Sequence, residues 1–255
     1  MKKYTLYCLL FLLLPLAPAA AQTPNYYLLA RQALQEGDQR KAVIFYTKSI
    51  ERGDEYRYLS YLGRAYRYYY LKRYEAARAD VLKAMEMPTT TEEYEWSMGH
   101  AHLLLGSLYS KEKDLPNALR EYTQAHQFLP EDAVLLNNIG YDLLKLGKLE
   151  HSIHYLTLAI EQDADFAYSY NNRAEAYLRL DRLEEAWEDL EKSKVKEPGN
   201  PVLLKNYGLY FLKTGQREEA CRYFHGANQD DKRDTWFYDD YQRLQSLIQE
   251  NCSTK

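Results

Sequence analysis

Residues 105–140 read LGSLYSKEKDLPNALREYTQAHQFLPEDAVLLNNIG, and two small residues in this stretch recur at a fixed distance. Gly106 follows a leucine in the first half, and Ala118 lies in the second half. Small residues recur at the same constant spacing from each of these two positions. The first column is Gly106, Gly140, Ala174 and Gly208, and the second is Ala118, Ser152, Ala186 and Ala220. Two independent columns that keep one period over four units indicate a repeat protein.

Each unit also contains two apolar stretches with the spacing of a helix. Leu105, Gly106 and Tyr109 fall on one helical face, and Ala118 and Tyr122 fall on the face of a second helix. Small residues at a helix crossing let two backbones approach closely, and an aromatic ring fills the adjoining groove. Glycines recur where a left-handed residue should end the first helix, at Gly37, Gly147 and Gly215. One such helix pair cannot bury its own apolar face, so we expect the pairs to stack.

The period and the small and aromatic positions together resemble the tetratricopeptide repeat family, whose 34-residue unit has the pattern L-G-x2-Y…A-x3-F…P. Looser copies at Leu29-Ala30 and at Leu62-Gly63 extend the pattern toward the N-terminus. The resemblance implies an all-α fold, a right-handed α-solenoid of about six helix pairs plus a C-terminal capping helix. The expected single domain covers residues 22–252, with repeats at about 23–55, 56–90, 91–132, 133–166, 167–200 and 201–234, and a capping helix at 235–250.

The spacing is irregular in the N-terminal half. The step from Gly63 to Gly106 is longer than one period by nine positions. If Ala77 is the small residue of the second helix, two of the additional residues lie among residues 67–73 and the others within residues 87–98. Capping-box spacings just before Thr91 predict a longer first helix in the third repeat, which begins near that residue. The capping helix is expected to hold Asp239, Asp240 and Gln242 on its polar outer side.

The N-terminal segment, residues 1–21, has the composition of an export signal. Lys2 and Lys3 precede an almost unbroken apolar run over residues 4–14, and prolines and small residues follow up to Ala21. A membrane-spanning helix needs about 20 apolar residues, and this run is too short. We therefore expect a cleavable signal peptide over residues 1–21 and no integral membrane segment in the mature chain. The signal is of a bacterial kind, so the periplasm is the expected location and secretion the alternative.

Composition and charge place the chain among ordinary globular proteins. Hydrophobic residues make up 46% and charged residues 27% of it, and 11 glycines with 8 prolines are too few for a β-rich fold with many tight turns. The formal net charge is −4, and loss of the two lysines of the predicted signal makes it −6. We do not expect such a negatively charged chain to bind nucleic acid.

The free face of each first helix should line a concave groove, which in the resembled family holds extended or helical peptides. The register places eight candidate peptide-binding residues there: Asn137, Asn138, Tyr141, Tyr168, Asn171, Asn172, Lys205 and Asn206. An amide both donates to and accepts from a main chain, so recurring asparagines suit a peptide ligand. The alternative is that these amides tie neighbouring helices together or face water.

Four arginines of the first two repeats form a second candidate site, a patch for an anionic ligand: Arg31, Arg57, Arg64 and Arg67. Guanidinium groups clamp carboxylates or phosphates by paired hydrogen bonds, and the interleaved tyrosines add stacking area. The alternative is that these tyrosines are packing residues and these arginines are simply solvated. A subfamily of the resembled repeats grips acidic C-terminal tails with a two-carboxylate clamp. Only Asn172 fits that clamp here, so its activity is not expected.

Signals for catalysis, cofactors and metals are weak. His151 and His154 lie one turn apart, but no cysteine or carboxylate stands at a supporting spacing, which favours a surface pair over a metal site. No nucleophile elbow, phosphate loop or HExxH motif occurs. We expect a non-enzyme with no cofactor and no metal.

Two cysteines remain after the predicted signal, Cys221 and Cys252. In stacked helices these positions should lie at the same end of the solenoid, and an even pair in an oxidising compartment suits a disulfide. A bridge is one hypothesis and two unpaired thiols are the other.

These observations favour an exported scaffold or adaptor of the bacterial cell envelope, which binds an unidentified protein or peptide along its concave face. The alternative function is a binding module for anionic glycans or cell-wall fragments, through the arginine and tyrosine side chains of the first two repeats. Charge reversal of the arginines should separate the two functions.

Overall fold

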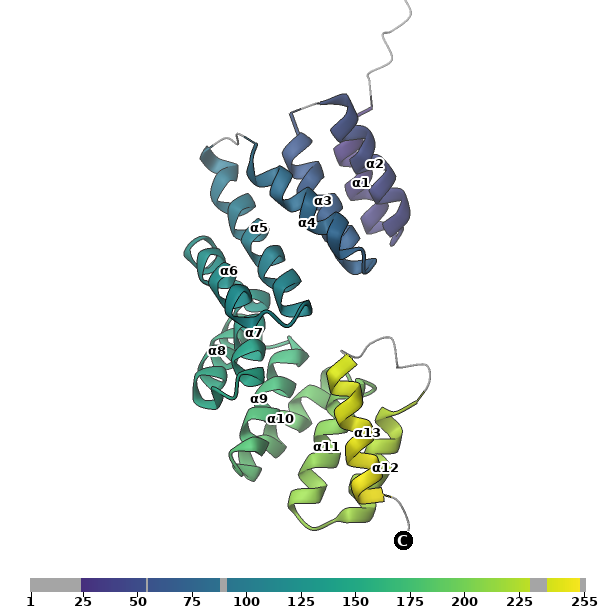
Figure 1. Cartoon of the computed structure of the whole chain (residues 1–255), viewed down its shortest axis with the longest axis vertical. Coiled ribbons are helices and arrows are strands. Elements are labelled where there is room, and N and C mark those ends of the chain that lie inside the picture. Colours follow the sequence, from purple (N-terminus) through teal and green to yellow (C-terminus); the bar gives the residue numbers. More distant parts are fainter. Residues whose placement is uncertain (1–23, 54, 88–90, 230–237, 253–255) are drawn as a thin grey trace, which may run out of the picture.

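The computed structural model describes residues 24–53, 55–87, 91–229 and 238–252 (Figure 1). The predicted signal peptide, residues 1–21, lies outside the described residues. Within the described ranges the chain forms thirteen helices and no strand. The helices are α1 (Tyr26–Gln35), α2 (Gln39–Arg52), α3 (Arg57–Tyr70), α4 (Tyr74–Met85), α5 (Thr91–Lys111), α6 (Leu115–Phe128), α7 (Ala133–Lys145), α8 (Leu149–Gln162), α9 (Ala167–Arg179), α10 (Leu183–Lys196), α11 (Pro201–Lys213), α12 (Arg217–Ala227) and α13 (Tyr238–Cys252).

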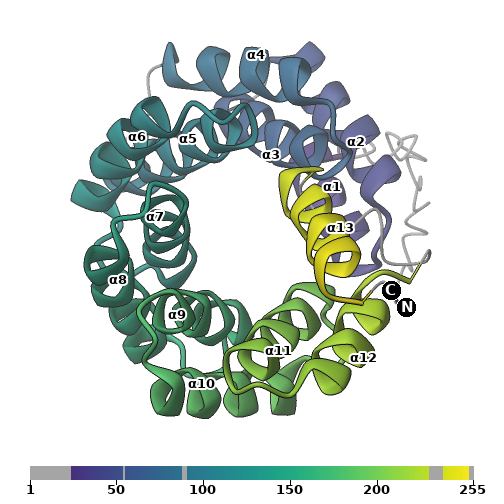
Figure 2. The same cartoon turned by 60° about the horizontal axis from the view of Figure 1, so that its bottom comes forward.

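The helices pack in consecutive pairs, from α1 with α2 to α11 with α12, and each pair packs on the next. Figure 2 shows the pairs arranged around a common axis, with the first helix of most pairs turned toward the centre and the second helix outside. The expected all-α solenoid of about six helix pairs with a C-terminal helix is confirmed.

Small residues allow the two helices of a pair to touch. A Cβ added at Gly106 would lie 2.4 Å from the ring of Tyr122, and one added at Gly208 would lie 2.3 Å from the ring of Phe224. The ring of the second helix therefore occupies the space that a side chain on the first helix would need. This contact explains the recurring column of small residues.

In the second repeat the small position is Ala65, and the assignment of Gly63 to it is wrong. Ala65 and Ala77 have the same separation in the sequence as Gly106 and Ala118 of the next repeat. Ala65 is fully buried in one cluster with Ala77 and Val81, whereas Gly63 faces the ring of Tyr46 in the preceding repeat. The predicted register of this repeat is therefore displaced by two residues.

This correction also moves the insertion. Three residues join the two helices of every pair, including residues 71–73 between α3 and α4, so the two additional residues expected among residues 67–73 do not exist. The step from Ala65 to Gly106 is longer than one period by seven positions. The additional residues lie in the connection to α5 and in α5 itself, which begins at Thr91 as predicted and is 21 residues long.

The connection inside each pair turns on one residue with a left-handed backbone. Gly37, Gly147 and Gly215 adopt it with φ of 80°, 73° and 79°, as their recurrence predicted. In the other three pairs non-glycine residues take the same position, with φ between 58° and 64°: Lys72, Lys113 and Asp181. The turn geometry is thus constant although the glycine is not.

The C-terminal helix closes the solenoid. Leu244 of α13 is fully buried among Ala220, Phe224 and Ala227 of α12. The sulfur atoms of Cys221 and Cys252 are 1.98 Å apart, so a disulfide links the end of α13 to α12. No helix within the described ranges has both the length and the apolar character that crossing a membrane requires.

Candidate functional site

The predicted asparagine residues of the concave side bond to one another across the repeats. The Oδ1 atom of Asn137 accepts from Asn172 Nδ2 at 3.0 Å, which joins α7 to α9. Asn206 Nδ2 donates to Asn171 Oδ1 at 2.9 Å, which joins α9 to α11. These four side chains are buried, so their amides tie neighbouring repeats together, as the alternative interpretation held. The fifth asparagine, Asn138, is half-buried and donates to Ser107 Oγ at 3.5 Å.

Lys205 is closed to ligands by a carboxylate of the neighbouring repeat. Its Nζ atom donates to Glu175 Oε2 at 2.9 Å, and the Lys205 side chain has no exposed surface. Arg179 donates to the other oxygen of Glu175 at 2.5 Å. Burial alone would raise the pKa of Glu175, but the charges of Lys205 and Arg179 beside it hold this pKa well below its ordinary value. Glu175 is therefore a charged group that balances two cations inside the inner wall.

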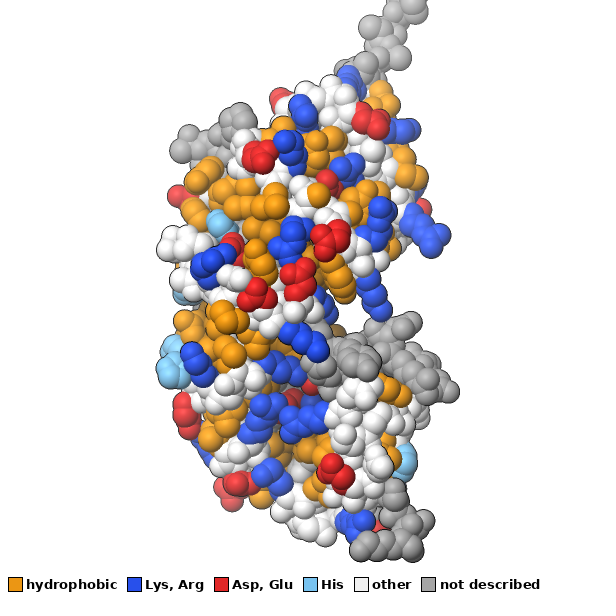
Figure 3. Space-filling view, viewed as in Figure 1, with side chains coloured by type: hydrophobic (Ala, Val, Ile, Leu, Met, Phe, Trp, Pro, Cys, Tyr) orange, Lys and Arg blue, Asp and Glu red, His pale blue; other side chains and the backbone are white. Residues whose placement is uncertain are grey.

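The C-terminal helix contributes a second buried carboxylate, Asp240, to the concave side of the solenoid. Asp240 of α13 accepts from Lys145 Nζ at 2.5 Å and from the hydroxyl of Tyr141 at 3.2 Å, both on α7. Asp240 is buried, which corrects the expectation that it lies on the outer side of this helix. Figure 3 shows Lys and Arg side chains gathered over α9 in this half of the molecule. Of the eight predicted peptide-binding residues, Tyr168 alone is exposed, at 44%.

Two of the four arginines of the predicted anionic patch already have partners within the protein. Arg64 donates to both carboxylate oxygens of Asp80, at 2.7 and 2.8 Å, and to Thr47 Oγ1 at 2.9 Å. Arg67 donates to Gln39 Oε1 at 2.8 Å. Arg57 is exposed at the start of α3. Arg31 differs from the other three, because it lines a pocket.

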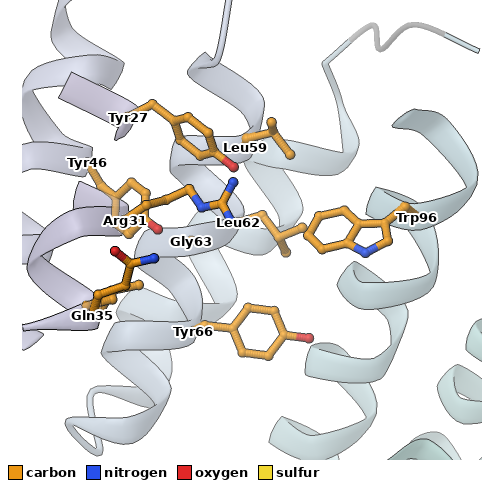
Figure 4. A pocket seen from close by; sticks show the side chains of 10 residues that line it. Tyr27, Arg31, Gln35, Tyr46, Leu59, Leu62, Gly63, Tyr66 and Trp96 are labelled. Atoms are coloured by element: carbon orange, nitrogen blue, oxygen red, sulfur yellow. The ribbon is translucent and has the colours of Figure 1, made fainter. Parts of the chain in front are cut away.

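This pocket has a volume of about 410 Å³ and lies between α1, α3 and the beginning of α5, with one residue from α2. Ten residues line it: Tyr27, Arg31, Leu34, Gln35, Tyr46, Leu59, Leu62, Gly63, Tyr66 and Trp96. Figure 4 shows Arg31 reaching into it from one wall and Trp96 standing on the opposite wall. We call these ten residues the N-terminal pocket.

Among the residues whose side chains the structure describes, Arg31 is the one charged residue that lines the N-terminal pocket. Its side chain has no ion pair or hydrogen bond to any of the residues that the structure describes. Two of the tyrosine hydroxyls are less available. Tyr66 donates to the carbonyl oxygen of His100 at 3.1 Å. The pKa of Tyr46 is raised, mainly because its side chain is buried. The pocket therefore offers aromatic and aliphatic walls, neutral hydroxyls and one available guanidinium group.

Sequence reasoning singled out Arg31 but missed Trp96. Trp96 is 51% exposed, and its ring lies 4.4 Å from that of His100. It belongs to the two additional turns of α5, outside the positions that recur with the period of the repeat. The predicted long helix was the available signal, since an exposed tryptophan on a helical extension points to binding.

Comparison with known proteins identifies the repeats. Residues 133–166 and 167–194 match the family model of the tetratricopeptide repeat. Residues 133–194 of the protein carry two tetratricopeptide repeats. Tetratricopeptide-repeat proteins generally mediate protein–protein interactions, and scaffolds of this kind are generally non-catalytic.

Curated relatives match parts of the chain. Hsp70-Hsp90 organizing protein 2 of Arabidopsis thaliana is 26% identical over 113 residues, which are 44% of this chain and 20% of that protein. Protein FlbA of Caulobacter vibrioides is 38% identical over 72 residues, which are 28% of this chain and 12% of FlbA. The chain thus spans a fifth or less of the length of these two relatives.

Solved structures share the fold at low sequence identity. The Cut9–Hcn1 hetero-tetramer of the APC/C has a TM-score of 0.70 at 15% identity, over 86% of this chain and 42% of that one. PilF of Pseudomonas aeruginosa has a TM-score of 0.62 at 16% identity, over 87% and 95% of the two chains. YrrB, described as a TPR protein with an unusual peptide-binding site, has a TM-score of 0.52 at 20% identity, over 80% and 97%.

The described residues hold no group of three or more His, Cys, Asp or Glu side chains that could bind a metal ion. His151 and His154 are both exposed on α8.

Proposed function

We propose that the protein is a non-catalytic adaptor that binds a protein or peptide on the concave side of its N-terminal half. The observation that carries this proposal is the N-terminal pocket, where apolar walls and an available guanidinium group coincide. In the C-terminal half the polar groups of the inner wall already bond to one another or to α13. The sequence predicted the peptide-binding surface on the fourth to sixth repeats, and we propose instead that it lies on the first three.

The relatives support binding of this general type. Tetratricopeptide-repeat proteins generally mediate protein–protein interactions, and YrrB is described as having a peptide-binding site. An interface anchored by Trp, Tyr and Arg side chains in a pocket is also the arrangement that concentrates binding energy in protein complexes. A partner for the N-terminal pocket is accordingly a polypeptide.

We also propose that the protein works after export, in the periplasm of a bacterial cell envelope. The composition of residues 1–21 and the disulfide between Cys221 and Cys252 support this location, because disulfides persist in oxidising compartments. Mass spectrometry of the protein purified from its native host tests it. Export predicts a mature chain that begins at Gln22 and carries the disulfide, and an intact Met1 with two reduced thiols would contradict it.

Photo-crosslinking in the native host tests the adaptor proposal. A photoreactive phenylalanine analogue in place of Leu59 puts the crosslinker in the N-terminal pocket, and the same analogue in place of Val195, which is 84% exposed on α10, is the matched control. We expect the Leu59 variant to form a discrete crosslinked product with another protein and the Val195 variant to form none. Equal crosslinking from both positions, or none from Leu59, would contradict the proposal.

One observation favours the second candidate function, a module for anionic glycans. Tyr27, Tyr66 and Trp96 surround Arg31, and aromatic rings beside a cation also suit a sugar acid. Charge reversal should be made at Arg31, since Arg64 is paired with Asp80 and its reversal would disturb the fold. Arg31→Glu that abolishes glycan binding and leaves protein capture unchanged would favour the glycan module.

A further inference from the structure

The N-terminal pocket depends on the additional turns of α5, which the repeats built on α7, α9 and α11 do not have. Helices α7, α9 and α11 each begin two turns before their small residue, whereas α5 begins at Thr91, about four turns before Gly106. Trp96 lies in the added part of α5, so it has no counterpart in those helices. The extension places this indole opposite α1 and α3 and thereby forms the far wall of the pocket (Figure 4).

The dimensions of the pocket suit one large side chain. A volume of about 410 Å³ falls in the range of small-ligand sites, about 300–1,000 Å³. Leu34, Leu59 and Leu62 contribute aliphatic surface, and Trp96 covers it from the other side. Figure 3 shows hydrophobic side chains at the surface over α5, so the apolar character continues outside the pocket.

The first two repeats, which supply nine of the ten lining residues, carry a net positive charge. Residues 24–87, which form the first two repeats, contain twelve basic and eight acidic side chains, a net charge of +4. Residues 88–255 contain 19 basic and 29 acidic side chains, a net charge of −10. The start of α5 contains Glu92, Glu93 and Glu95, so the positive charge comes from α1 to α4 and not from the far wall of the pocket. A net positive charge on those helices favours acidic ligands. Arg31, the one charged side chain among the described lining residues, is available to pair with them.

Resting on the adaptor function above, we propose that the N-terminal pocket binds an acidic peptide segment. A phenylalanine or leucine side chain of the partner inserts between Trp96 and the leucines, and a carboxylate within two residues of it pairs with Arg31. A sugar acid fits this pocket less well, because the hydroxyls around a sugar ring need hydrogen-bond partners. Apart from the tyrosine hydroxyls and the indole N–H of Trp96, only Gln35 and Arg31 among the described lining residues offer polar side-chain groups.

Tryptophan fluorescence and calorimetry test this inference on the full chain. The chain has three tryptophans, and replacing Trp187 and Trp236 by phenylalanine leaves Trp96 as the reporter. The probes are the peptides Ac-Gly-Ser-Asp-Phe-Glu-Ser-Gly-amide, its Lys-Phe-Lys analogue and its Asp-Ala-Glu analogue, with N-acetylmuramic acid as the glycan probe. We expect the first peptide to change the Trp96 emission in a saturable way and to bind at least ten-fold more tightly than either analogue or the sugar.

Two arginine variants provide the matched comparison. Arg31→Gln should weaken the calorimetric affinity for the acidic peptide about ten-fold, and Arg40→Gln, an exposed arginine outside the pocket, should leave it unchanged. Equal effects of the two variants, equal binding of the Lys-Phe-Lys peptide, or binding of the sugar without the peptide would overturn the inference. If crosslinking at Leu59 captures a protein but the acidic peptide does not bind, the adaptor function stands and the acidic anchor is wrong.

Discussion

Replacement of Glu175 should expose how strongly the inner wall depends on its buried charges. Glu175→Gln keeps the shape of the side chain but removes the charge that pairs with Lys205, which has no exposed surface. Lys205→Met is the matched change, because it removes the cation and leaves Glu175 with Arg179. The two variants remove the same ion pair from opposite sides, yet they leave different charged groups without a counter-charge.

The expected magnitudes follow from what remains. After Glu175→Gln the Lys205 ammonium group is buried beside a neutral amide, and loss of one partner of a buried ion pair costs about 3–5 kcal/mol. After Lys205→Met the carboxylate still accepts from Arg179 at 2.5 Å, so we expect a loss of about 1–2 kcal/mol, near that of a charged hydrogen bond. The double variant leaves no unpaired ammonium group and should be more stable than Glu175→Gln alone.

Urea unfolding followed by circular dichroism measures these differences at pH 7, with the double variant completing the cycle. Because the pKa of Glu175 is lowered in the folded protein, its contribution is full above its unfolded pKa and is lost as the pH falls below about 4. The difference between wild type and Glu175→Gln should shrink accordingly in acid. A loss below about 1 kcal/mol for Glu175→Gln at pH 7, or equal losses for the two single variants, would refute this reasoning.

Three further predictions concern other parts of the structure. Burial raises the pKa of Asp142 to about 6. The free energy of unfolding should therefore fall by at most about 3 kcal/mol as the pH rises from about 4 to about 6. Asp142→Asn should flatten that decline in thermal melts. Gly147→Ala should lower the free energy of unfolding by about 1 kcal/mol because φ there is 73°, whereas Lys113→Gly at the equivalent turn should not; equal losses in urea titrations would contradict this. Thiol titration of the oxidised, denatured mature chain should find no reactive thiol, and two reactive thiols would rule out the disulfide. Removal of the disulfide should lower the free energy of unfolding by about 3–4 kcal/mol, if it acts by restricting the unfolded chain.

The helix pairs could be predicted because the crossing of two helices demands a small residue at a fixed spacing. A small residue is required once in every repeat from Gly106 onward. At three of these small residues the structure places an aromatic or leucine side chain of the second helix against the backbone. In the second repeat the demand is met by Ala65, while the nearby Gly63 serves a different contact with Tyr46. A glycine in the sequence does not say which neighbour needs it to be small.

The surface of the solenoid was harder to predict, because it depends on how the pairs stack. The sequence could place Asn137 and Asn172 on the concave sides of their two helices, but whether the amides meet depends on the distance between α7 and α9. Asp240 reaches α7 from the far end of the chain, so nothing local signals its burial. Trp96 lies in an extension that interrupts the repeat, which is why the periodic pattern did not mark it.

Partner retention by Trp96→Ala tests the central claim most directly. Trp96 is half exposed and its ring contacts His100 of the same helix, so the variant should keep the helical circular dichroism of the wild type. We expect partner recovered from the native host to fall at least ten-fold with Trp96→Ala and to stay unchanged with Val195→Ala, since an aromatic anchor typically contributes about 2 kcal/mol or more. Equal recovery with the two variants would show that binding does not depend on the N-terminal pocket.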